Sequence, residues 1–382
     1  MSAACCRAGG RESFVTNASQ QNNQNTQRHP AVMAKQAGGA MGGFGLFSPR
    51  IVRQRIKTSS LADRGFYSLS LLMIGLVGVL TLSVLAILIW NSWPTWREFG
   101  FGFLWSHRWS PTQDIYGALP QIIGSILTSV IALVLVVPFS LGAAMALNLL
   151  VPPWLKFPLS LIIQLLAGIP SIIYGFWGLY MLAPWLEQQI YPHLLQLGEN
   201  GLLKFIFAPI FAAPGSGISL LTAAIILAIM VLPYIVAIMS ESFDAVPPAL
   251  RESAYGLGGT TGEVFRHVIL PTAKQGVLGG IFLGFGRALG ETMAVTFVIG
   301  NAHRLPQSLI GPGTSIPASL ANEFNEASSP LYLSSLVALG LILYGLTLLL
   351  FVLARKLLLS DSKPNKPSKP INQTPSPSGE KA

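Results

Sequence analysis

The sequence predicts an all-α polytopic membrane protein with six transmembrane helices and both termini in the cytoplasm. Hydrophobic residues make up 51% of the chain and charged residues only 10%, with a mean hydropathy of +0.57. Soluble domains carry about 25% charged residues, so this composition excludes an ordinary soluble protein. Six long hydrophobic segments predict the spans, and the distribution of lysine and arginine predicts their orientation.

The first three spans are predicted at 65–96, 119–149 and 155–182. The first holds no charged residue and exceeds the ~20 residues that a membrane-spanning helix needs. Pro138 interrupts the second span and Pro170 the third. Because proline removes a backbone hydrogen bond, we expect a kink at both positions, and we interpret these kinks as packing features.

The last three spans are predicted at 218–239, 277–300 and 331–354, with Pro233 inside the fourth. The polar segments between spans alternate between the two sides of the membrane. Three of them are expected as outer loops, at 91–120, 187–217 and 301–330.

The chain divides into four predicted regions. Residues 1–49 are rich in Asn, Gln, Gly and Ala and are expected to form a disordered tail, or to precede a true start at Met33. Residues 50–64 form a basic juxtamembrane segment suited to an anionic membrane surface. The permease domain is predicted at 65–355, and 356–382 are expected to be a disordered C-terminal tail.

Charge predicts the sidedness. Of the 24 lysines and arginines, nineteen lie before the first span at 1–64, after the last span at 355–382, in the 151–156 connection and in a polar loop at 241–275. Only four lie in the three outer loops. Because positively charged loops stay on the cytoplasmic side, the tails and the polar loop are expected in the cytoplasm.

The polar loop and three other stretches resemble a known family. In the loop, a glycine follows the Glu by six residues, and a Val-Ile-Leu-Pro run begins ten residues after that glycine. This is the spacing of the EAA loop of bacterial ABC importer permeases, whose last element is Ile-x-Leu-Pro. Three further stretches are similar to the permease subunits of phosphate-specific importers. The resemblance covers about 65–355 and implies the type I ABC importer permease fold. Its residues are Glu252-Ser253-Ala254, Gly258 and Val268-Ile269-Leu270-Pro271 in the loop, and Pro170–Leu179, Gly286–Thr296 and Leu320–Phe324 outside it.

The resemblance implies that the polar loop couples the chain to an ATPase, with the segment 248–257 docking in a groove of that partner. We expect Gly258 to join two short helices, because glycine adopts a positive φ at little cost. Pro271 is expected to end the second of them. The coupling residues implied are Arg251, Glu252, Ala254, Gly258, Leu270 and Pro271.

The fifth span carries two ionisable residues, Arg287 and Glu291, followed by Thr292. Ionisable residues inside a span indicate a functional site. On one continuous helix, these two residues would share a face with three of the glycines, so we predict an ion pair in which Glu291 orients Arg287 toward an anion path facing a second permease. The alternative is that the pair only locks the span to its neighbours. Close helix packing is predicted at Gly276, Gly280, Gly284 and Gly290.

The resemblance implies a permease subunit of an ATP-driven importer of inorganic phosphate. Its expected partners are a homologous permease subunit, a cytoplasmic ATPase dimer, an extracytoplasmic phosphate-binding protein and membrane lipid. The sequence contains no Walker A pattern, so ATP hydrolysis is expected on the partner. We expect no cofactor, no metal and, despite the net charge of +9, no nucleic-acid partner.

Three alternatives stay open at this point. The substrate could be another oxyanion such as sulfate or molybdate, or the chain could be the sister phosphate permease. A channel or an ion-coupled transporter would need no ATPase. A membrane scaffold would leave the polar loop as a solvated connection.

Overall fold

The computed structural model describes residues 61–199 and 217–360. Their regular structure is helical, apart from one isolated β-bridge between Ser110 and Ile115. Five of the helices are long and apolar enough to cross a membrane, and a bent helix pair supplies a sixth if it counts as one span. The predicted all-α polytopic class is confirmed.

The chain divides into two compact units, 1–83 and 84–382, and the boundary falls inside helix α3 (Leu61–Phe99). In the first unit the structure describes only the start of α3. Between 66 and 83, its phenylalanine, leucine, isoleucine, valine and methionine side chains are exposed, as expected for a helix that is apolar all round and meets lipid. The predictions for 1–49, for 50–60 and for 361–382 lie outside the described residues.

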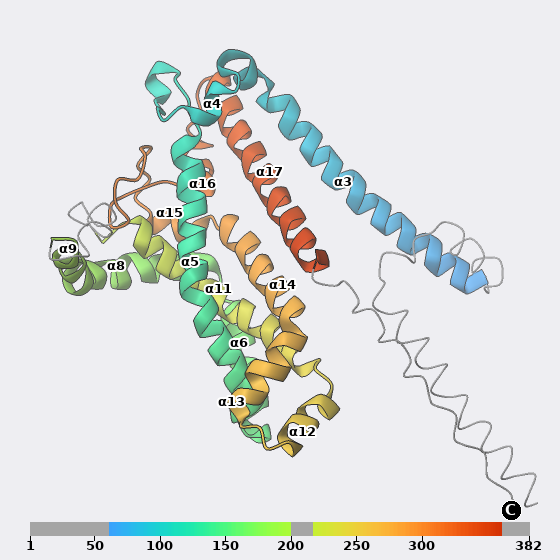
Figure 1. Cartoon of the computed structure of the whole chain (residues 1–382). Helices are drawn as coiled ribbons and strands as arrows, with labels where there is room; N and C mark the ends of the chain where they lie inside the picture. Colours follow the sequence, from blue (N-terminus) through green and yellow to red (C-terminus); the bar gives the residue numbers. More distant parts are fainter. Residues whose placement is uncertain (1–60, 200–216, 361–382) are drawn as a thin grey trace, which may run out of the picture. The chain divides into compact units, whose positions relative to one another are not determined.

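The core of the second unit forms around α11 (Leu220–Asp244), which packs against α5 (Leu119–Met145) and α14 (Leu270–Leu289) (Figure 1). Most of α11 is buried because its neighbours cover it on several sides. α17 (Pro330–Ser360) packs on α14. α17 continues past 355, so the predicted start of the C-terminal tail at 356 is wrong: the apolar run extends through 357–359.

The prolines of the spans differ in their effects. α5 runs without a break through Pro138 and packs against α11, so Pro138 does not interrupt the span, and the kink expected there stays a prediction. At Pro170 the chain does break, as predicted: α6 (Pro153–Ala167) and α7 (Ser171–Trp177) meet at 83°.

After α7, helix continues through α8 (Ala183–Trp185) to α9 (Tyr191–Glu199), joined by the π-helical segments Gly178–Leu182 and Leu186–Ile190. The outer loop predicted to begin at 187 is therefore helical as far as 199. Its apolar side chains are buried against α11, with Leu186 and Tyr191 at the centre of that contact, and this packing outweighs the polar residues between them.

The fifth span also departs from prediction. α12 (Pro248–Gly256) is followed by a continuous helix that begins with α13 (Thr261–Val264), passes through the π-helical segment Phe265–Ile269 and becomes α14. The helix ends at Leu289, and a short α15 (Met293–Val298) follows, so 277–300 is not one helix. Glycine at 290 weakens the helix, and the Thr292 hydroxyl donates to the Gly290 carbonyl at 3.3 Å instead.

The outer loops contain helix that the sequence did not predict. α4 (Gly102–Trp105) lies in the first, together with a 3₁₀ turn at Pro111–Gln113, and α16 (Ile316–Glu323) lies in the third. The first turn of α16 is anchored on α5, because the Ser125 hydroxyl accepts the Ile316 N–H at 2.8 Å. We call this end of the second unit the α4 end and the opposite one the α12 end (Figure 1).

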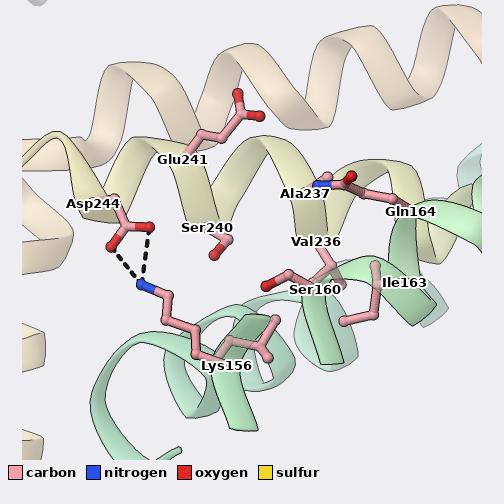
Figure 2. A pocket seen from close by; sticks show the side chains of 10 residues that line it. Lys156, Ser160, Ile163, Gln164, Val236, Ala237, Ser240, Glu241 and Asp244 are labelled. Atoms are coloured by element: carbon pink, nitrogen blue, oxygen red, sulfur yellow. Dashed lines mark hydrogen bonds and ion pairs between the residues drawn. The ribbon is translucent and has the colours of Figure 1, made fainter. Parts of the chain in front are cut away.

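A cavity of about 140 Å³ lies between α6 and the last turns of α11, close to the α12 end (Figure 2). Polar side chains from both helices line it: Lys156, Ser160 and Gln164 from α6, and Ser240, Glu241 and Asp244 from α11.

Candidate functional site

The predicted coupling loop is built around α12, which begins four residues after α11 ends. Gly258 follows α12 with a φ of +85°, the left-handed conformation that the sequence predicted for it. The next helix starts at once with a capping box, in which the Thr260 side chain and the Glu263 side chain each bond the other's backbone N–H. Gly258 therefore sets the angle between α12 and α13.

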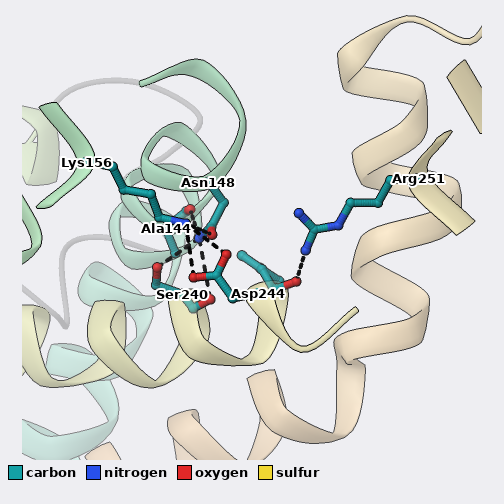
Figure 3. A network of polar contacts seen from close by, with 7 residues as sticks. Ala144, Asn148, Lys156, Ser240, Asp244 and Arg251 are labelled. Carbon is teal, nitrogen blue, oxygen red and sulfur yellow. Dashed lines mark hydrogen bonds and ion pairs between the residues drawn. The ribbon is translucent and has the colours of Figure 1, made fainter. Parts of the chain in front are cut away.

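Arg251 ties α12 to the preceding helix. One of its guanidinium nitrogens donates to the Phe243 carbonyl in the last turn of α11 (Figure 3). Its Nε is buried and has no hydrogen-bond partner among the described residues. The prediction placed Arg251 in the contact with a partner, whereas here it bonds within its own chain, because the tight α11–α12 turn brings the two helix ends together.

The remaining loop residues divide into a buried and an exposed set. Ala254 packs against the core, whereas Glu252 is exposed. Three large apolar side chains of this helix and its end are also exposed, to 46% at Leu250, 43% at Tyr255 and 90% at Leu257. We call these three residues the docking face, because exposed apolar groups beside charge mark an interaction surface.

Leu270 packs against the core, and Pro271 lies in the first turn of α14 without ending the helix, contrary to prediction. The π-helical turn before it provides the reason, since its wider backbone leaves room for the proline ring. The Thr272 hydroxyl donates to the Val268 carbonyl at 2.6 Å and satisfies one acceptor there.

The glycines of α14 bring it close to α11 of the same chain. A Cβ at Gly280 would lie 3.0 Å from the Ile238 side chain, and one at Gly284 would lie 2.6 Å from that of Ile235. Gly276 faces Ser242 in the same way. The predicted close approach is therefore present at these three glycines, and the helix that approaches is α11. Among the described residues no side chain lies within 4 Å of such a Cβ at Gly290, so the packing predicted there is not made within this part of the chain.

The ionisable residues of the fifth span are separated by the end of α14. Arg287 is exposed, with its guanidinium carbon 5.7 Å from the centre of the Tyr234 ring. Glu291 is half-buried and lines a small pocket with Ser129 and Ser315. Among the described residues Arg287 and Glu291 form no ion pair. The predicted pair is wrong, because it required one helix through both positions, whereas the chain leaves the helix after 289. Thr292 lies in the same break.

A polar cluster at the α4 end was not predicted. Glu323 is only 8% exposed. Its Oε2 accepts hydrogen bonds from Trp109 Nε1 at 2.8 Å and from the Tyr332 hydroxyl at 2.6 Å, while His303 Nε2 lies 2.7 Å from Oε1. Gln121 lies 3.3 Å from the other ring nitrogen of His303. One carboxylate thus joins the first and third outer loops to α17. In the sequence, Glu323 stood out only as part of the stretch 320–324 that resembles the family.

The surroundings of Glu323 shift the pKa of its carboxyl group. Burial opposes ionisation of Glu323, but hydrogen bonds from His303, Tyr332 and Trp109 outweigh it and hold the pKa below the ordinary value of 4.5. Next to it, burial and the hydrogen bond to Asp114 raise the pKa of Tyr116 to about 12. Glu323 is therefore an anion and Tyr116 a neutral donor at neutral pH.

We expect Glu323→Ala to destabilise the protein by about 3 kcal/mol, because buried donors lose a charged acceptor. A depressed carboxyl pKa contributes stability that is present above the ordinary pKa and lost as pH falls through the lowered one. Thermal unfolding in detergent from pH 7 to pH 3 measures this. Glu323→Gln is the matched control and should lose less stability while flattening the acid dependence. Equal stability of Glu323→Ala and the parent protein would contradict this role.

Comparisons with known proteins identify the family of this chain. A family model described as binding-protein-dependent transport system inner membrane component matches residues 136–358, which contain α11, α12 and α14. This match defines the class: a membrane component of a binding-protein-dependent transport system.

Three relatives are named phosphate transport system permease protein PstC, one of them with the qualifier "probable". The Mesorhizobium japonicum protein is 48% identical over 81% of this chain and 92% of its own, and that of Pasteurella multocida is 49% identical over 75% and 88%. The relative described as probable, from Methanocaldococcus jannaschii, is 35% identical over 75% and 89%. A solved structure of the MetNI methionine ABC transporter is similar at 14% identity and a TM-score of 0.46, over 66% of this chain and 99% of that one. The chain belongs to the PstC family of permease proteins.

Proposed function

We propose that the chain is one of two permease subunits of an ATP-driven importer of inorganic phosphate in a bacterial inner membrane. The observation that carries the proposal is the 48% identity to a phosphate transport permease along 92% of that protein. The partners would be a second, PstA-like permease, a PstB-like ATPase dimer in the cytoplasm and a PstS-like phosphate-binding protein outside.

The exposure of Arg287 supports a path for an anion. A charge inside a span costs about 2.5 to 3.5 kcal/mol where it meets lipid. α15 follows the helix that carries Arg287, and its Ala294, Val295 and Val298 are buried. Because Glu291 does not pair with Arg287 among the described residues, the guanidinium would be available to an incoming anion in a water-filled path between two permeases. A guanidinium can bind two phosphate oxygens at once.

The docking face supports the contact with the ATPase. Leu250, Tyr255 and Leu257 are exposed beside the charged Glu252, and Arg251 and Gly258 hold α12 at a set angle to its neighbours. Nineteen of the basic residues lie in the polar loop that contains α12, in the 151–156 connection, and in the sequence before the first span (1–64) and after the last (355–382). By the positive-inside rule the α12 end and both termini would lie in the cytoplasm.

The test is ATP-dependent uptake of labelled phosphate by the full complex in proteoliposomes, with sulfate and molybdate as competitors. We expect uptake that needs ATP on the α12 side and is competed by neither anion. Uptake without ATP would favour a channel or an ion-coupled carrier, and competition by sulfate or molybdate would favour another oxyanion. Uptake driven by ATP supplied at the α4 end would contradict the orientation.

A further inference from the structure

Four polar side chains join three helical segments near the α12 end: Asn148, Lys156, Ser240 and Asp244, here called the clamp (Figure 3). Lys156 Nζ lies 2.8 and 3.0 Å from the two carboxylate oxygens of Asp244 and donates to Asn148 Oδ1 at 3.0 Å. Asn148 Nδ2 donates to the Ser240 hydroxyl at 2.8 Å. Lys156 belongs to the first turn of α6, Asn148 to the π-helical segment Ala146–Leu150 after α5, and the other two to α11.

The clamp lies directly beside the attachment of α12. Asp244 is the last residue of α11, and its neighbour Phe243 accepts the hydrogen bond from Arg251 of α12. The Phe243 ring is buried against Phe265, with the ring centres 5.3 Å apart. At the end of α11, Phe243 therefore bonds α12 and its neighbour Asp244 bonds α6. A displacement of α12 would reach α6 through these two residues.

Beside the clamp, a cavity separates α6 from α11. The cavity between them has a volume of about 140 Å³ and is lined by Ser160, Gln164 and Glu241 as well as by clamp residues (Figure 2). A polar space of this size has room for water. The clamp is also half-exposed, at 34% for the Lys156 side chain and 49% for that of Asp244. Exposed ion pairs contribute little to stability, so removing this pair should leave the fold and the assembly of the complex intact.

We propose that the clamp is the positioning element that makes α6, and the bent α6–α7 span it begins, follow the coupling helix α12. The proposal rests on the proposed function, in which the ATPase moves α12. The network Lys156–Asp244 and Asn148–Ser240 transmits that movement laterally, from the base of α11 to α6. Without it, α12 would move while α6 stayed behind, and ATP would be hydrolysed with little transport.

The experiment measures phosphate uptake and ATP hydrolysis by the reconstituted full complex, and the amount of complex purified. The variants are Lys156→Gln, Asp244→Asn and the exchange Lys156→Asp with Asp244→Lys. Glu241→Gln is the matched control, because it removes a carboxylate from the same cavity, one turn away on α11 and outside the clamp. We expect each single variant to lower the phosphate transported per ATP by about fivefold, within the range that positioning residues change coupling between sites.

ATP hydrolysis and the amount of complex should stay near the parent values in the single variants. The exchange should restore at least about half of the parent ratio, since the ion pair re-forms with reversed charge. An unchanged ratio in the single variants, a parallel loss of complex, or an exchange that rescues nothing would overturn the proposal. If Gly258→Val lowers the phosphate transported per ATP while the clamp variants do not, only the role of the clamp is refuted. If the parent complex does not couple ATP hydrolysis to phosphate uptake, the proposed function itself is refuted.

Discussion

Arg287→Gln is expected to lower phosphate uptake by the assembled complex at least a hundredfold, or about 2.7 kcal/mol at about 1.36 kcal/mol per tenfold. Glutamine keeps much of the length but loses the charge and the paired N–H groups that bind two oxygens of one anion. Arg287→Lys should recover uptake only in part, because an ammonium is a point charge without the planar fork. Uptake of labelled phosphate in proteoliposomes, scaled to the amount of complex, is the measurement.

Two further variants separate transport from structure. Arg304→Gln removes an exposed arginine from the outer loop and should leave uptake unchanged. Tyr234→Leu removes the ring under the Arg287 guanidinium while keeping the cation, and should retain most of the uptake. If Tyr234→Leu and Arg287→Gln both reduce the amount of complex to the same extent, Arg287 serves packing and the anion path lies elsewhere.

Gly258→Val is expected to reduce phosphate transported per ATP at least about tenfold while the complex still assembles. A β-branched residue at a φ of +85° is a conformational outlier. A left-handed conformation costs an L-residue roughly 1 to 2 kcal/mol, and the chain would relieve it by rotating α12. A rotated α12 carries Leu250, Tyr255 and Leu257 away from the groove they would occupy. Parallel assays of ATP hydrolysis and uptake give the ratio.

Gly256 and Gly262, two residues before and four residues after Gly258, are the control positions. Gly256 and Gly262, like Gly258, leave open space around a Cβ, but neither has a positive φ. Gly256→Val and Gly262→Val should therefore retain the transport ratio, since valine is no worse a helix former than glycine. If all three substitutions lowered the phosphate transported per ATP alike, side-chain bulk near the docking face would be responsible, and not the φ angle of residue 258.

Much of the architecture was predictable from local properties. Long apolar runs identified the membrane-spanning helices, because about 20 apolar residues are needed to cross the bilayer as a helix whose backbone groups hydrogen-bond to one another. The break at Pro170 and the positive φ of Gly258 were predicted from residues whose own covalent structure restricts or frees the backbone. The spacing of the polar loop indicated the family, because that spacing is a property of the chain and does not depend on how the helices pack.

The predictions that failed in and around α14 depended on neighbouring structure that the sequence does not reveal. The end of α14 at Leu289 depends on the competition between weak helix formers and the packing of α15, so the sequence alone did not separate Arg287 from Glu291. The glycine stripe correctly predicted a close helix approach, but a stripe does not say which helix approaches. Pro271 stays within a continuous helix because a π-helical turn precedes it.

The amino-acid sequence was enough to establish that this is a membrane permease, where most of its spans lie, and which loop has the spacing of a coupling loop. Which distant residues meet followed only from the packed helices. Glu323 receives hydrogen bonds from Trp109, 214 residues away, and Lys156 pairs with Asp244 across 88 residues. Hydropathy and backbone preferences act over one or two helical turns and are visible along the chain. Contacts between side chains far apart in sequence depend on how the helices pack, which no local pattern records.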